Sequence, residues 1–265
     1  MTDQLVKAIV DGLEWCESVG VKNGVPMRDK REPGRRRKME AEQRMSAIIR
    51  RMWRRQREKI QQRLELEHPA RKKLDQLEIN IADDEALAEL IMEIILETQD
   101  GVSLFDEDMD LTLDYTATNT EAAEWAREYA YDLVKNIDAA TSASLQQAVS
   151  AFVETPGMTI GDVMSLLPFD AERAMRVAVT EITRAYAHGQ QMAGDALKEQ
   201  YPDVKVMKRW FTNNDDRVCP MCGPLDGNEV EMDENFYEPE DSYQDGNPPR
   251  HVNCRCWLNQ YTSME

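Results

Sequence analysis

The chain has 265 residues, which is long enough for a substantial hydrophobic core in one large or two small domains. Its 50 acidic residues outnumber 32 basic ones, and the net charge of −18 argues against a chain that binds nucleic acid over its whole surface. Because no stretch is long and apolar enough to span a membrane, and the first residues do not resemble a secretory signal, we expect no membrane association.

The positive charge is concentrated in one segment. Residues 28–73 hold 18 Lys and Arg against 7 Asp and Glu, and the rest of the chain carries −29. Such asymmetry favours two different partners, one of them polyanionic. Two basic clusters are candidates for contacting DNA or an acidic protein surface, with a solvated helix face as the alternative. They are Arg35, Arg36, Arg37 and Lys38, which we expect in a flexible arm, and Arg50, Arg51, Arg54 and Arg55.

Residues 1–100 are predicted to be a basic, amphipathic and helical N-terminal region. Apolar residues at three- and four-residue spacing predict a short helix over 3–20, a long helix over 35–66 and another over 71–99, with a break near the acidic residues 83–85 as the alternative. Residues 101–118 are polar and acidic, and we predict a linker there.

Residues 119–201 form the second predicted helical part. Two helices are expected over 119–139 and 142–154. A short helix capped by Thr159 follows, and Asp170 caps a long helix that ends before Pro202.

Residues 202–265 change from helical to strand periodicity. Val204, Val206, Lys208 and Trp210 alternate with a second set of side chains, which is typical of a strand. A turn signal at 225–228 leads into a second strand, and a last short strand is expected from about residue 255. The predicted fold class is therefore mainly α, with a helical body followed by a small zinc-stapled α+β C-terminal module.

Five potential metal ligands lie in two short clusters of this module. The clusters are separated by 28 residues and consist of Cys219 and Cys222, and of His251, Cys254 and Cys256. A Cys-x-x-Cys pair lets two thiolates face one ion, and the second cluster closes the tetrahedron, so we predict a structural Zn²⁺ site. Cys254 and Cys256 are two residues apart and point the same way in extended chain, so either can be the fourth ligand. The alternative is reduced cysteines packed as small apolar side chains.

A catalytic zinc would keep three protein ligands and a water, with a general base nearby. Asp215, Asp216 and Glu229 are candidate bases, but their spacing supports no particular mechanism. We therefore predict no catalytic residue.

Several stretches of this region occur in a recognisable order, namely Trp210, Asp215 to Cys222, Leu225 to Gly227 and Pro248 to Cys256. This order resembles the phage Mu protein F-like family of head-morphogenesis or minor capsid proteins. The upstream stretch Ala178 to Tyr186 resembles the family's Arg-Thr-Glu element, although Val179 stands where the family usually has arginine.

The resemblance implies a non-enzymatic protein of the phage head (virion), made in the host cytoplasm and present in few copies. Its expected partners are the portal protein and the major capsid protein, with packaged double-stranded DNA as a further candidate. The rival hypotheses are a zinc-dependent nuclease or toxin-like hydrolase, and a zinc-finger DNA-binding regulator. The acidic character of the module argues against the regulator.

Three charged residues inside these stretches are candidates for a structural role: Glu181, Arg184 and Arg255. We predict that Glu181 is partly buried and anchors Arg255, which would lock the zinc module onto the helical part. The alternative is a surface ion pair between Glu181 and Arg184, three residues apart on one helix.

Overall fold

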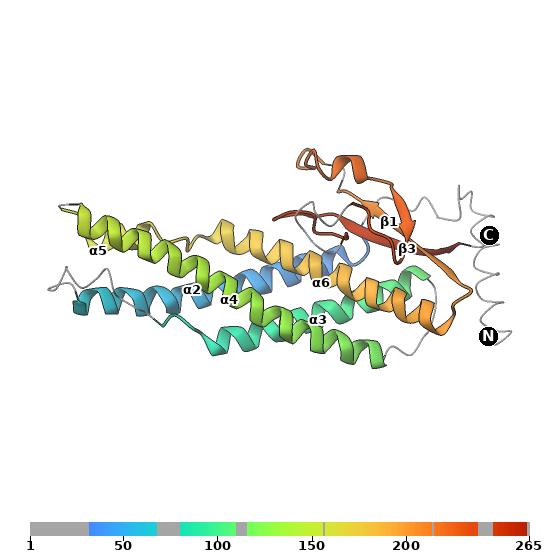
Figure 1. Ribbon diagram of the computed structural model, residues 1–265, viewed down its shortest axis with the longest axis horizontal. Coiled ribbons are helices and arrows are strands. Elements are labelled where there is room, and N and C mark those ends of the chain that lie inside the picture. The colour runs from blue at the N-terminus through green and yellow to red at the C-terminus, as the bar shows by residue number, and fades with distance from the viewer. Residues whose placement is uncertain are drawn as a thin grey trace.

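The computed structural model describes residues 32–67, 80–109, 116–155, 157–213, 215–237 and 246–263. In these residues the chain forms long helices that lie side by side, with a small antiparallel sheet over one end of the bundle (Figure 1). The predicted arrangement, a helical body followed by a small α+β module, is confirmed. The helix predicted over 3–20 lies outside the described residues.

The helices are α2 (Arg35–Glu67), α3 (Asp84–Met109), α4 (Thr116–Glu154), α5 (Ile160–Ser165) and α6 (Ala171–Gln200). Both predicted caps are present. Thr159 and Asp162 form a reciprocal capping box at the start of α5, and the Asp170 side chain accepts a hydrogen bond from the Arg173 amide at 2.6 Å. These side chains satisfy amides that would otherwise lack partners in the first turn of each helix.

Two expectations about helix ends were wrong. Helix α4 is continuous where two helices were predicted, because residues 139–142 contain no Gly or Pro, and the buried Thr141 hydroxyl donates to the Ile137 carbonyl within the helix. Residues 101–109 are helical where a linker was predicted, because Val102, Leu104 and Phe105 extend the buried apolar face of α3. The division into separate segments stays a prediction.

Helices α3 and α6 approach each other more closely than ordinary side chains would allow. A Cβ atom added at Gly189 of α6 would lie 2.0 Å from the Thr98 carbonyl oxygen, and one added at Gly101 would lie 2.4 Å from the Tyr186 carbonyl oxygen. Glycine is required at both positions because the obstructing atoms belong to the backbone. Residues of α2, α3, α4 and α6 share one apolar core around this contact.

The sheet has the order β2-β1-β3, and both pairs are antiparallel. The strands are β1 (Lys205–Phe211), β2 (Glu229–Glu231) and β3 (Trp257–Ser263). The predicted alternation in β1 is confirmed, since Val206, Lys208 and Trp210 are all buried. The predicted turn also returns the chain to the sheet, because the Gly227 amide donates to the Trp210 carbonyl at 2.8 Å. The sheet packs on α6, where Gln190 donates to Gln260 at 3.1 Å.

Candidate metal centre

The first cysteine pair lies in the connection between β1 and β2. The Cys222 amide donates to the Cys219 Sγ at 3.3 Å, and the Gly223 amide donates to the Cys219 carbonyl at 2.9 Å. The backbone therefore turns around the Cys219 sulfur and directs an N–H group at it. An amide in this position can also donate to the sulfur of a metal-bound cysteine.

The second cluster lies immediately before β3. Asn253 adopts a positive φ of 65°, a left-handed conformation that Asn tolerates better than most residues, so the chain turns between His251 and Cys254. Cys254 and Cys256 follow this turn and are both buried.

The structure brings all five predicted ligands together in two overlapping groups. Cys219, Cys222 and His251 have ligand atoms within 4.8 Å of one another, and so do Cys222, Cys254 and Cys256. Cys222 belongs to both groups. Its Sγ lies 3.9 Å from that of Cys254, and the Cys219 Sγ lies 3.0 Å from the His251 Nε2. Two thiolates bound to one tetrahedral zinc at roughly 2.3 Å lie roughly 3.8 Å apart, so the cluster has suitable dimensions to hold a metal ion.

The orientation of His251 also fits metal binding. Its Nδ1 lies 2.8 Å from the Val252 carbonyl oxygen, which can only accept a hydrogen bond, and its Nε2 faces the Cys219 Sγ, so a metal would meet the ring at Nε2. In the second group, hydrogen bonds from the Cys222 thiol and from backbone amides lower the pKa of Cys254. Thiolates with one imidazole are a donor set that suits zinc.

The predicted contact between Glu181 and Arg255 is wrong. Arg255 instead forms a two-pronged ion pair with Asp215, at 2.7 and 2.8 Å. Glu181 is buried as expected, but it accepts a hydrogen bond from the Tyr129 hydroxyl and lies 3.4 Å from the Arg184 guanidinium. Arg184 and Glu181 are both largely buried, so their pair is not a surface ion pair either.

The pairing of Arg255 with Asp215 bears on the catalytic alternative. The hydrogen bonds from Arg255 lower the pKa of Asp215 to about 2, so this carboxylate is a poor proton acceptor near neutral pH. Glu229, a second candidate base, forms an ion pair with Arg209. The ion pair of Asp215 instead ties the loop before Cys219 to the second cluster.

Two threonines of α6, which the sequence did not single out, hold the C-terminal module on the bundle. The Thr180 hydroxyl accepts from the Asn253 amide at 2.7 Å and donates to the Arg176 carbonyl at 2.7 Å. The Thr183 hydroxyl donates to the Cys254 carbonyl at 3.2 Å. Thr180 could have been identified from the sequence, because it precedes Glu181 in the stretch that resembles the family element. Its hydroxyl suits this role because it can donate one hydrogen bond and accept another.

The first basic cluster does not form a flexible arm. Helix α2 begins at Arg35, so the backbone of these four residues is fixed. The Lys38 side chain is buried and forms an ion pair with Glu32, which leaves Arg35, Arg36 and Arg37 exposed.

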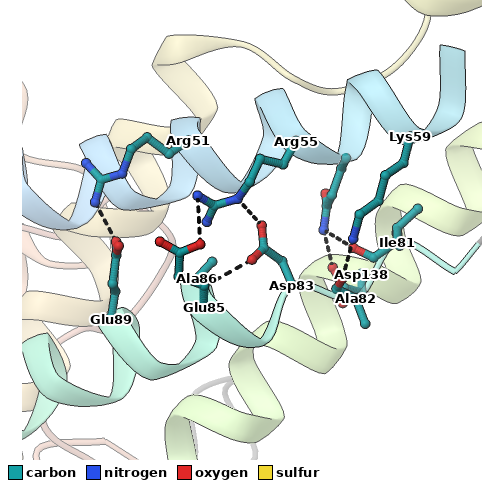
Figure 2. Close-up of polar contacts among 11 residues, drawn as sticks. Arg51, Arg55, Lys59, Ile81, Ala82, Asp83, Glu85, Ala86, Glu89 and Asp138 are labelled. Carbon is teal, nitrogen blue, oxygen red and sulfur yellow. Dashed lines mark hydrogen bonds and ion pairs between the residues drawn. The ribbon is translucent and has the colours of Figure 1, made fainter. Parts of the chain in front are cut away.

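The second basic cluster is divided between two faces of α2. Figure 2 shows Arg51 and Arg55 reaching toward carboxylates of α3 and the residues before it: Arg51 pairs with Glu89, and Arg55 pairs with Asp83 at 2.6 Å and Glu85 at 3.6 Å. These two arginines therefore serve packing between α2 and α3.

Arg50 and Arg54 are exposed on another face of α2, and neither forms an ion pair with a carboxylate of the described residues. The Arg50 Nε bonds the Ser46 carbonyl at 3.4 Å. A contact of these two residues with DNA or the portal stays a prediction.

No helix of the described ranges has the length and apolar character needed to cross a membrane.

Comparison with known proteins gives one match. Searches of curated proteins and of solved structures returned no significant match. A family model described as Phage Mu protein F like protein matches residues 124–259, just over half of the chain, including most of α4, strands β1 and β2, the start of β3 and all five potential metal ligands. The chain belongs to the Phage Mu protein F like family.

Proposed function

We propose that this protein is a minor head protein of a tailed phage that acts in head morphogenesis. The observation that carries the proposal is the family match, which spans helices of the bundle and the metal module together. Thr180 and Thr183 join these two parts, which fits a single assembly unit rather than a tethered catalytic domain. The protein would be made in the host cytoplasm and carried in the virion in few copies, without enzymatic activity.

The metal in this proposal is a structural Zn²⁺ held by Cys219, Cys222, His251 and Cys254. Cys254 is favoured over Cys256 because its Sγ lies at a suitable distance from that of Cys222 and because backbone amides donate to it. Four protein ligands leave no open position for substrate or water. Cys254→Ser should therefore lose bound zinc while Cys256→Ser retains it, as measured by metal content per chain.

The proposed partners are the portal protein and the major capsid protein, with packaged DNA as a further candidate for the exposed arginines. Arg50, Arg54 and the first turn of α2 offer guanidinium groups that suit carboxylates and phosphates alike. The double variant Arg50→Glu, Arg54→Glu should weaken binding to purified portal or to duplex DNA. A matched control is Arg127→Glu, Lys135→Glu, which makes the same charge change on exposed positions of α4.

The decisive experiment is quantitative mass spectrometry of purified phage heads, comparing this chain with the portal and major capsid proteins. A few to a dozen or so copies per head supports the proposal. Absence from the particle, with the chain abundant in infected cells, would contradict it and would put the zinc-dependent hydrolase first.

A further inference from the structure

Lys208 is a cation in the interior of the C-terminal module. It lies at the centre of β1 with 1% of its surface exposed. Its Nζ donates to the Gln191 Oε1 and to the Asn247 Oδ1, both at 2.9 Å, and lies 5.7 Å from the centre of the Phe236 ring. In the described part of the chain it has no ion pair with a carboxylate. Burying a charge in this way is costly, so its two amide partners have to offset the loss of water.

These hydrogen bonds join β1 to α6 and to the segment 246–251. Gln191 of α6 also accepts from the Asn247 Nδ2 at 3.1 Å and donates to the Met232 carbonyl at 2.8 Å. The Asn247 carbonyl accepts from the Tyr237 hydroxyl at 3.0 Å. Asn247 is therefore held on three sides, and the interaction with Lys208 is the one that involves a charge.

The segment 246–251 contains one potential metal ligand and contacts the backbone between two others. His251 lies at its end. Arg250 donates to the carbonyl of Met221, which stands between Cys219 and Cys222, at 2.8 Å. A shift of Asn247 would consequently move His251 relative to the first cysteine pair.

We propose that Lys208 is a positioning residue for the metal site, which fixes Asn247 and thereby holds the segment that delivers His251 to Cys219. The inference rests on the proposed structural metal. Residues that orient ligands without binding the metal typically change metal affinity about 10–100-fold when they are removed.

The charge that this role requires is present at neutral pH. Burial lowers the pKa of Lys208 to about 8, against the opposing effect of Asp195 on α6 and of Asp233 and Glu234 after β2. The ammonium form therefore predominates at pH 7, and both amide oxygens have a charged donor.

The test measures the rate at which the zinc-loaded full-length chain releases its metal to an excess of a colorimetric chelator. Lys208→Met keeps the length of the side chain and removes the donors, and Asn247→Ala removes the same hydrogen bond from the other side. Each should release metal about tenfold faster than the wild type, and the double variant should be no faster than the singles. Lys205→Met is the matched control, because Lys205 lies on the same strand but pairs with Glu231 at the surface.

Asn247→Leu separates positioning from simple packing, because it keeps the volume of the side chain and removes the oxygen that accepts from Lys208. It should release metal about as fast as Asn247→Ala, whereas a wild-type rate would assign the effect to packing, and this comparison decides the question even where Lys208→Met does not fold. Wild-type release rates in both Lys208→Met and Asn247→Ala would overturn the role of Lys208 and leave the proposed structural metal in place. A wild-type chain that holds no zinc would overturn the structural metal itself.

Discussion

The helical bundle and the C-terminal module are stabilised in different ways. The bundle buries apolar side chains from four long helices, and Gly101 and Gly189 bring two of their backbones into contact. The module has a much smaller apolar cluster, in which Cys222, Cys254 and Cys256 are themselves members. A sheet of three short strands can bury too little surface to be stable alone. The bundle should therefore tolerate loss of the proposed metal, and the module should not.

The largest expected effect follows from removing the ligand common to both groups of the metal centre. Cys222→Ser should abolish metal binding, and with it the roughly 10 kcal/mol or more that a structural zinc contributes to folding of such a module. Limited proteolysis should then cut the module after α6 and leave the bundle intact. Cys16→Ser, which changes the one cysteine outside the module, serves as the control. A Cys222→Ser chain as resistant to protease as the wild type would remove the distinction between the two regions.

Much of the difference between the bundle and the module could be predicted from the sequence, because the sequence patterns that indicate it are local. The ligand spacing, the caps at Thr159 and Asp170 and the alternation in β1 all depend on residues close together in the chain. The alternation even grouped Lys208 with Val206 and Trp210, the set that is buried, although its role was not recognised. Local rules work here because caps and strand faces are set by neighbouring residues.

The predictions that were wrong mostly concern contacts between residues that are distant in sequence. Whether Arg255 meets Glu181 or Asp215 depends on how the loop before Cys219 folds over the module, which no spacing encodes. The position of Arg51 and Arg55 against α3 likewise depends on packing between helices, so their contacts could not be separated from those of Arg50 and Arg54. The helix break predicted between residues 139 and 142 is absent, because Thr141 and Leu145 continue the buried face of α4 across this stretch.

A second substitution should have a smaller effect, and should destabilise the bundle while leaving the module intact. Gly189→Ala places a methyl group against the Thr98 carbonyl oxygen and should lower the free energy of unfolding of the bundle by about 2 kcal/mol, because overpacking outweighs the gain of about 1 kcal/mol in helix propensity. Metal content should stay at the wild-type level. Gly161→Ala is the control, since it is exposed and its nearest neighbour would be the Thr159 hydroxyl at 3.5 Å, so its stability should be unchanged or slightly higher. Urea unfolding followed by circular dichroism measures both, and an unaltered midpoint for Gly189→Ala would contradict the close contact.

The smallest effect concerns a buried carboxylate of the bundle. Glu97 on α3 is 3% exposed and bonds the Arg44 guanidinium at 2.7 Å. Burial is the largest cause that raises its pKa from 4.5 to about 7. Between these two values the folded state keeps a proton that the unfolded chain has lost, so the free energy of unfolding should fall as the pH rises through this window.

Glu97→Gln cannot ionise, so it should lack this fall. Relative to the wild type, it should gain stability as the pH rises from 5 to 8, by on the order of 1–2 kcal/mol. Urea unfolding at several pH values measures the difference. Glu85→Gln, on the exposed side of the same helix, removes a carboxylate without touching the buried one and should keep the wild-type slope. Parallel pH profiles for Glu97→Gln and the wild type would mean that Arg44 keeps Glu97 ionised throughout. The bundle would then owe none of its pH dependence to this buried group.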